Sequence, residues 1–371
     1  MKVIISAAGT GGHINPGIAI ANKIKQKEPN SKIIFIGTNR GLENDLVPRA
    51  GFELKTIEAY GLRKELSIKN IKGIFKTLSS IKDAKKIIDE FKPDIVIGTG
   101  GYICGPVFSA AISRKIPTVL HESNAYPGKA VKMFAKNVDK VLVGFEEAKN
   151  RLTEAKDVVV TGTPTKIKKL DISDKQKEKI KNKLGIKNNL PIVLIFGGSQ
   201  GAQKINEAVE KIIENKINEN YQIIWATGPK QYDLIKEKLE KNNLNINNLK
   251  NSKILPYIYN MEEILNISDL AICRSGAMTI TEITIVGKPA IFIPLPSNLA
   301  NRQEDNARVL EKIGAAKIII NDELDYKKLA EEIDDIIGNK SELEEMGKLA
   351  NRLAPVNVEE KIYEEIKKIL K

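Results

Sequence analysis

The fold is decided by residues 3–16, which read VIISAAGTGGHINP. The apolar start predicts a β-strand, and the apolar residues that recur at helical spacing over 18–24 predict a helix directly after the glycines. Glycines at a strand-to-helix turn let the backbone approach a ligand closely, and the N–H groups of the new helix favour an anion or another electron-rich group. His13 is the side chain in this turn that exchanges a proton near neutral pH.

Two nucleotide-binding signatures do not fit this turn. The dinucleotide fingerprint needs a third small residue where the chain has Ile14, and an acidic residue at the end of the second strand, where it has Gly37-Thr38-Asn39. A P-loop needs Gly-Lys-Ser/Thr after the glycines, and none follows. The turn is therefore Rossmann-like without that cofactor chemistry. The alternative is a turn that only closes a βα unit and leaves His13 as a surface residue.

Length and composition indicate a globular protein of about two domains. The chain has 371 residues, of which 42% are hydrophobic and 29% charged. It begins with a predicted strand, so we expect no signal peptide, and no apolar run approaches the roughly 20 residues of a membrane span. Cys104 and Cys273 are too few for a disulfide framework or a cysteine-based metal site, which favours reducing cytosol.

The charge balance favours an anionic partner. With 59 Lys+Arg against 47 Asp+Glu, the formal net charge is +12, which suits phospholipid head groups or a phosphorylated substrate. Aromatic residues make up only 5% of the chain, and no basic run is interleaved with them. A base-stacking nucleic-acid surface is therefore not expected.

Residues 1 to about 163 alternate between apolar strands and helical stretches. Near-continuous apolar strands of this kind predict a parallel sheet covered on both faces, with functional loops at the carboxyl ends of the strands. Two such loops stand out, Gly98–Tyr102 and His121–Asn124. The predicted strands are Lys2–Ala7, Ile33–Ile36, Asp94–Gly98, Thr118–His121, Lys140–Val143 and Val158–Val160.

Residues Leu62 to Lys92 form an unusual segment between the second and third of these strands. Apolar residues recur at helical spacing, and the segment carries nine Lys or Arg against four Asp or Glu, a net +5. One interpretation is an amphipathic helix with a solvated basic face. The other is a patch that binds an anionic membrane surface. The apolar members are Ile68, Ile71, Ile74, Phe75, Leu78 and Ile81, and the lysines among them include Lys69, Lys72 and Lys76.

A polar, lysine-rich connection from Pro164 to about Asn189 precedes a second start of the same kind. Residues 191–196 predict a strand, 197–202 a glycine turn and 203–213 a helix. Further strands are expected over 222–227, 270–273 and 289–294. Gly276 opens another helix, and Glu282 within two turns of its start is able to accept hydrogen bonds from a ribose, or simply to complement the helix dipole. Two Rossmann-like domains facing one another across a cleft are the simplest architecture.

Read together, these motifs closely resemble the MurG family of N-acetylglucosaminyltransferases over essentially the whole chain. The resemblance implies the α/β GT-B fold, with parallel sheets in both domains and no metal or other cofactor. It implies an acceptor-binding, membrane-associating domain over 1–163, a donor-binding domain over 164–354, and a last helix, about 355–371, that packs back on the first domain. The motifs are Gly9–His13 with Pro16, Gly98–Tyr102, His121-Glu122 with Asn124, Gly197–Ala202, Arg274–Ala277 with Glu282, and Gln303 with Asn306.

The resemblance also implies a role for each matching residue. Ser199 would hold the diphosphate of UDP-GlcNAc, Glu282 the ribose and the backbone of Ile258 the uracil. His13 and the glycine loops of the first domain would face the acceptor, with Gly101 and Tyr102 binding it. Because His13 sits where the helix dipole keeps its ring neutral, we expect it to act as, or directly assist, the general base. The other donor-binding residues would be Thr10, Gly11, Gly12, Asn124, Lys166, Ala277, Met278, Thr279 and Gln303.

Three positions depart from the family pattern. Lys166 stands where the family often has arginine, so the positive charge near the diphosphate is kept but the bidentate fork is lost. Ser123 replaces a usual glutamine, and Glu304 stands where glutamine or threonine is common. Gln303 is then the main expected contact to the sugar.

The implied reaction is an inverting transfer of GlcNAc to the 4-hydroxyl of MurNAc in the undecaprenyl-linked muramoyl-pentapeptide of peptidoglycan synthesis. The protein would act as a peripheral protein on the cytoplasmic face of the cell membrane. Two alternatives remain open, an isomerase similar to UDP-GlcNAc 2-epimerases and a transferase acting on another lipid. His121 is the other histidine and a rival base, although pairing with Glu122 would give it a structural role.

Overall fold

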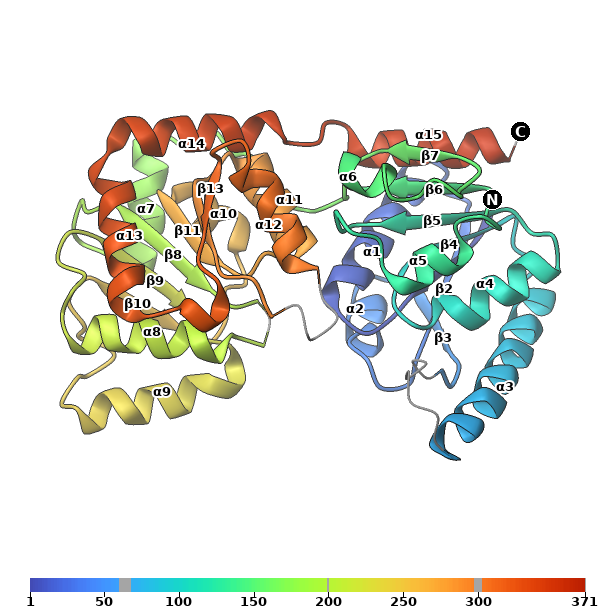
Figure 1. The fold of residues 1–371 in the computed structure, drawn as a ribbon, viewed down its shortest axis with the longest axis horizontal. Coiled ribbons are helices and arrows are strands. Elements are labelled where there is room, and N and C mark those ends of the chain that lie inside the picture. The colour runs from blue at the N-terminus through green and yellow to red at the C-terminus, as the bar shows by residue number, and fades with distance from the viewer. Residues whose placement is uncertain (60–67, 199, 297–301, 371) are drawn as a thin grey trace. The chain divides into compact units, whose positions relative to one another are not determined.

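The computed structural model describes residues 1–59, 68–198, 200–296 and 302–370, and gives side chains outside 68–78. The chain forms two compact units, Met1–Lys166 together with Pro355–Lys371, and Ile167–Ala354. The first unit thus extends three residues beyond the expected boundary at 163. Each unit is built on its own sheet, whose strands are all parallel (Figure 1).

The first unit has a seven-stranded sheet in the order β3-β2-β1-β4-β5-β6-β7. The order places the carboxyl ends of β1, β4 and β5 side by side. The elements are β1 (Lys2–Ala7), α1 (Gly11–Lys27), β2 (Lys32–Gly37), α2 (Glu43–Arg49), β3 (Glu53–Thr56), α3 (Ile68–Phe91), β4 (Ile95–Gly100), α4 (Cys104–Ser113), β5 (Thr118–Glu122), α5 (Lys129–Phe134), β6 (Lys140–Val143), α6 (Glu146–Lys149), β7 (Val158–Val160) and α15 (Val358–Ile369).

Alternating side chains of the central strands supply two cores, one on each face of this sheet. Ile4 points to the face covered by α4 and α5, whereas Val3 and Ile5 point to the face covered by α1 and α15. Both faces are apolar because helices cover both, which is why the strands read as continuous apolar runs.

The second unit has a six-stranded sheet in the order β10-β9-β8-β11-β12-β13. Its core packs α8 and α13 on one face and includes the fully buried Trp225. The elements are α7 (Asp174–Leu184), β8 (Ile192–Phe196), α8 (Gln203–Glu214), β9 (Gln222–Ala226), α9 (Pro229–Lys241), β10 (Ser252–Leu255), α10 (Met261–Ile267), β11 (Leu270–Cys273), α11 (Ala277–Val286), β12 (Ala290–Phe292), α12 (Gln303–Glu311), β13 (Ala316–Ile318), α13 (Tyr326–Gly338) and α14 (Lys340–Arg352).

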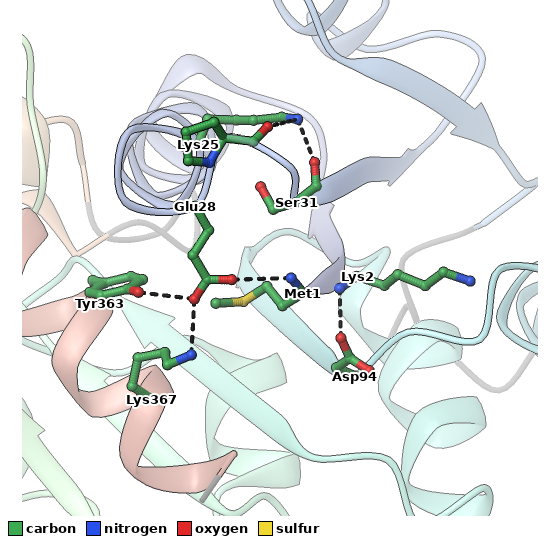
Figure 2. Close-up of polar contacts among 9 residues, drawn as sticks. Met1, Lys2, Lys25, Glu28, Ser31, Asp94, Tyr363 and Lys367 are labelled. Atoms are coloured by element: carbon green, nitrogen blue, oxygen red, sulfur yellow. Dashed lines mark hydrogen bonds and ion pairs between the residues drawn. The ribbon is translucent and has the colours of Figure 1, made fainter.

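Helix α15 returns to the first unit and packs against α1. It buries Val358, Ile362 and Ile366, which recur every four residues and so line one face of the helix. Glu28, at the end of α1, fastens the contact by accepting hydrogen bonds from Tyr363 Oη and Lys367 Nζ, both at 2.9 Å, and from the N-terminal amine at 3.1 Å (Figure 2). The hydrogen bond from Lys367, aided by those from the amine and Tyr363, lowers the pKa of Glu28 to about 2.

Three strands, β3, β10 and β13, were not expected from the sequence. All three lie at the edges of their sheets, and β3 reads ELKT, with no apolar run. An edge strand has one neighbour and one solvated side, so its residues need not be apolar.

Candidate functional site

The glycine turn after β1 places His13 in the first turn of α1. His13 Nδ1 lies 3.2 Å from the carbonyl oxygen of Ala8. Because a carbonyl only accepts, Nδ1 carries the hydrogen of this bond. Nε2 of the neutral ring then holds the lone pair, so this partly exposed side chain is able to accept a proton from a ligand hydroxyl.

The loop after β4 fits closely around this histidine. A Cβ on Gly100 would lie 2.4 Å from His13 Cδ2, and a Cβ on Gly101 would lie 2.5 Å from the carbonyl oxygen of Ala8. Both glycines have positive φ, 117° and 86°, which other residues rarely adopt. Thr99 Oγ1 donates to the carbonyl of His13 at 2.7 Å. The first two glycine motifs therefore form a single site around His13.

A buried carboxylate that the sequence reading missed supports the same turn. Glu43, the first residue of α2, is fully buried and accepts a hydrogen bond from Gly9 N–H at 3.0 Å. Its other oxygen accepts from Thr38 N–H and Thr38 Oγ1, at 2.9 and 2.7 Å. The available signal was an acidic residue in the first turn of the helix that follows the second strand.

The expected pairing of His121 with Glu122 is wrong, because adjacent residues of a strand point to opposite faces of the sheet. His121 is buried, and its Nε2 donates to the carbonyl of Gly162 at 3.0 Å. Burial lowers its pKa to about 4. Glu122 instead orders the loop that follows it, accepting from the backbone and side-chain N–H of Asn124, both at 2.9 Å, and from Gly128 N–H at 2.6 Å. His121 is thus structural, and Glu122 ties the loop carrying Asn124 to the end of β5.

In the second unit, the glycine turn after β8 packs directly against the turn after β9. A Cβ on Gly201 would lie 2.0 Å from the carbonyl oxygen of Thr227, and a Cβ on Gly228 would lie 2.5 Å from Gly201 N. Only glycine fits at this contact. Ser199, the expected diphosphate ligand, lies outside the described residues.

Two helices begin at the carboxyl ends of the neighbouring strands β8 and β11. Their N-cap residues, Ala202 and Gly276, have no polar side chain, so the first N–H groups of α8 and α11 are not capped by them. Uncapped helix N-termini favour a phosphate. Helix α11 carries Ala277, Met278, Thr279 and the partly exposed Glu282.

Gln303, the first residue of α12, contacts the turn that precedes α11. Its carbonyl oxygen accepts from Ser275 Oγ at 2.8 Å, and its side-chain oxygen accepts from Leu295 N–H at 2.9 Å. These bonds fix which way the side-chain amide points. Asn306 is fully buried and donates to the carbonyl of Ser275 at 3.1 Å, so it supports the backbone of this turn.

Arg274 is another structural residue that the motif had left without a role. It is buried, and its Nη1 donates to the carbonyls of Ile293 and Pro294 and to Asn321 Oδ1, at 2.9 to 3.0 Å. Burial lowers its pKa below the ordinary arginine value. It ties the end of β11 to the chain that leaves β12.

The remaining predicted site residues divide between the two units. Tyr102 is exposed two residues before the start of α4, and Lys166 is exposed at the end of the segment Met1–Lys166 of the first unit. Ile258 is buried in the loop after β10. Glu304 pairs with Arg308 Nη2 at 3.0 Å on the surface of α12. Thr10, Gly11 and Gly12 open α1 beside His13.

Two kinds of feature are absent from the described residues. No three His, Cys, Asp or Glu side chains gather there as a metal site. No helix in the described parts of the chain is both long and apolar enough to cross a bilayer.

The chain is similar to known glycosyltransferases over its whole length. Residues 3–143 match the glycosyltransferase family 28 N-terminal domain, and residues 192–362 match the family 28 C-terminal domain. A protein of Acetivibrio thermocellus named UDP-N-acetylglucosamine--N-acetylmuramyl-(pentapeptide) pyrophosphoryl-undecaprenol N-acetylglucosamine transferase is 45% identical, with 100% of this chain and 99% of that protein covered. A Clostridioides difficile protein of the same name is 39% identical, covering 100% of this chain and 89% of that protein.

Solved structures also match the chain over almost its whole length. The crystal structure of Acinetobacter baumannii MurG matches with a TM-score of 0.76 and 28% identity, covering 99% of each chain. A UDP-GlcNAc 2-epimerase from Neisseria meningitidis matches with a TM-score of 0.66 at 16% identity, covering 99% of this chain and 100% of the other, and so shares the fold alone. The chain therefore belongs to the MurG family of glycosyltransferases, with the two Rossmann-like domains of the GT-B fold.

Proposed function

We propose that this chain transfers GlcNAc from UDP-GlcNAc to the 4-hydroxyl of MurNAc in undecaprenyl-diphospho-MurNAc-pentapeptide. The observation that carries the proposal is the 45% identity, over 100% of this chain and 99% of the relative, to a transferase named for this donor and this acceptor. The described geometry supports it with two helix N-termini suited to a diphosphate in one unit and a histidine in a glycine-lined site in the other.

The second unit would bind the donor. The N–H groups that open α8 and α11 would stabilise the negative charge that develops on the departing UDP. Glu282 would accept hydrogen bonds from the two ribose hydroxyls, and Gln303 would bind the sugar through its fixed amide. Ser199, Ala277, Met278, Thr279 and the backbone of Ile258 would complete the nucleotide site.

The first unit would supply the base. His13 Nε2 would take the proton of the acceptor hydroxyl while that oxygen bonds to the anomeric carbon of GlcNAc from the face opposite the leaving group. The bond from this carbon to the UDP oxygen breaks, and its electron pair leaves with the diphosphate. Gly101 and Tyr102 would bind the acceptor.

Five further residues of the first unit would help to bind the donor. These are Thr10, Gly11, Gly12, Asn124 and Lys166, whose ammonium would lie near the leaving diphosphate as a point charge rather than a bidentate fork.

We further infer that the protein works as a peripheral protein on the cytoplasmic face of the membrane, where a lipid-linked acceptor lies. The support is the basic, amphipathic sequence of α3, in which Lys69, Lys72 and Lys76 alternate with apolar residues. Residues 62–67 of that segment lie outside the described residues, as do the side chains of 68–78.

The test is a transfer assay with UDP-GlcNAc and a lipid-diphosphate muramoyl acceptor, followed by mass spectrometry of the lipid product. The proposal predicts a lipid product heavier by one GlcNAc and release of UDP. A second incubation with UDP-GlcNAc alone tests the epimerase alternative. Appearance of the 2-epimer, with no glycosylated lipid in the first reaction, would overturn the proposal.

A further inference from the structure

We propose that Glu43 is a positioning residue that acts on His13 through the peptide group between Ala8 and Gly9. The inference rests on the proposed role of His13 as the base, and deepens it. The proposed chain of interactions begins at the Glu43 carboxylate, which accepts from Gly9 N–H. It continues through the same peptide group to Ala8 C=O, which accepts from His13 Nδ1–H, and ends at the lone pair of His13 Nε2.

The geometry of one peptide bond carries the inference. Gly9 N–H donates to Glu43 Oε2 at 3.0 Å, and the Ala8 carbonyl lies 3.2 Å from His13 Nδ1. These N–H and C=O groups belong to the same peptide unit, where a trans bond points them in opposite directions. The carboxylate on one side and the imidazole on the other therefore hold the same rigid plane.

The carboxylate is itself held in place. Thr38 donates two hydrogen bonds to Glu43 Oε1. The Glu43 side chain also fills the space beside two glycines, since a Cβ on Gly37 would lie 2.7 Å from Glu43 Cγ and a Cβ on Gly41 would lie 2.0 Å from Glu43 Oε2. Burial raises the pKa of Glu43, but the hydrogen bonds from Gly9 and Thr38 outweigh it and leave the pKa below the ordinary value. The group is thus a buried anion at neutral pH.

The carboxylate affects the histidine in two ways. It orients the Ala8 carbonyl toward Nδ1, which fixes the tautomer in which Nε2 is the acceptor. It also polarises the peptide group, because an N–H that donates to an anion leaves more negative charge on the carbonyl oxygen of the same peptide. Consecutive hydrogen bonds of this kind strengthen one another. Both effects favour proton uptake at Nε2.

The wild-type protein allows a first test that needs no variant. The chain has two histidines, and their contacts require opposite tautomers, since His13 donates from Nδ1 and His121 donates from Nε2. Imidazole 15N NMR at about pH 8.5, two units above the ordinary histidine pKa, distinguishes these tautomers. The proposal predicts one ring of each kind, with the Nδ1–H ring assigned to His13 by its loss in His13→Ala. Two Nε2–H rings would overturn it.

The second test is Glu43→Gln. Glutamine has one acceptor oxygen, and this oxygen is best placed facing the two Thr38 donors. The NH2 group of the glutamine then faces Gly9 N–H, so that two donors oppose each other. We expect His13 to lose its Nδ1–H preference, and kcat for transfer to fall roughly 10- to 100-fold, the size of the loss when the partner that orients a metal-bound imidazole is removed. The KM for UDP-GlcNAc should change less than kcat, because the proposed ribose contact at Glu282 and the two helix N-termini proposed for the diphosphate lie in the other unit.

Glu28→Gln is the matched control. Glu28 lies in the same unit and also accepts three hydrogen bonds, but at the far end of α1 from His13. It should leave the His13 tautomer and kcat unchanged. If Glu43→Gln folds and keeps both the Nδ1–H tautomer of His13 and the parental kcat, Glu43 has no positioning role. If the tautomer changes but neither Glu43→Gln nor His13→Ala lowers kcat, the proposed base is wrong while the peptide link itself is supported.

Discussion

Gly100 offers a test of how closely the histidine site is built. Replacing it with alanine places a methyl group 2.4 Å from His13 Cδ2, at a residue whose φ is 117°. An ordinary carbon contact is about 3.5 Å, so roughly 1 Å of overlap must be relieved by moving the imidazole or the loop. A displacement of about 1 Å at a reacting group costs on the order of 100-fold in rate, and the backbone conformation costs about 1–3 kcal/mol in stability.

Gly51→Ala separates the two effects. Gly51 also has positive φ, 83°, but a Cβ there meets nothing within 4 Å. It should therefore lose stability without losing kcat, whereas Gly100→Ala should lose both. Thermal unfolding and steady-state transfer kinetics on the two variants decide the matter. A folded Gly100→Ala protein with the parental kcat would show that the imidazole position is unimportant for the reaction.

Three further predictions concern the donor, the membrane and acid stability. Glu282→Ala should weaken UDP-GlcNAc binding by about 2–3 kcal/mol, mainly as a higher KM, and an unchanged KM in a folded variant contradicts the ribose role. Changing Lys69, Lys72 and Lys76 to Glu should reduce sedimentation with anionic vesicles most strongly at low salt while UDP affinity stays the same, since each lysine near such a surface contributes about 1 kcal/mol; equal sedimentation removes the support for the patch. Glu28, whose pKa is about 2 against an ordinary 4.5, stabilises the fold above pH 4.5 and loses that contribution as pH falls toward 2. Glu28→Gln should therefore lower the unfolding free energy of the first unit by about 1–2 kcal/mol at pH 7, after allowance for solvent screening, and by less at low pH; a difference independent of pH refutes this.

The parts of the fold that the sequence predicted are those with a local cause. Buried strands such as Lys2–Ala7 read as apolar runs because helices cover both faces of the sheet, and glycine turns mark where strands give way to helices. The two parallel sheets follow from that alternation, and the structure confirms them. The edge strands β3, β10 and β13 were missed because each is only three or four residues long and is interrupted by a lysine.

In the site, too, the features with a local sequence signal were predicted and those that depend on distant contacts were not. His13 and the glycine loops were evident in the sequence because their chemistry lies in a few consecutive residues. Glu43 was not, because its contact with Gly9 spans 34 residues, and an acidic residue in the first turn of a helix is also typical of an exposed position. The wrong pairing of His121 with Glu122 came from treating sequence neighbours as spatial partners, although a strand separates them to opposite faces.

The catalytic role of His13 is tested most directly by the kcat of His13→Ala with UDP-GlcNAc and the lipid-diphosphate muramoyl acceptor, measured beside the parent protein. Loss of a general base lowers the rate about 10²–10⁴-fold, so we expect a fall of that size with the KM for UDP-GlcNAc little changed. A folded His13→Ala protein that keeps near-parental kcat would contradict it, and the base would then be sought at Tyr102 and the loop after β5.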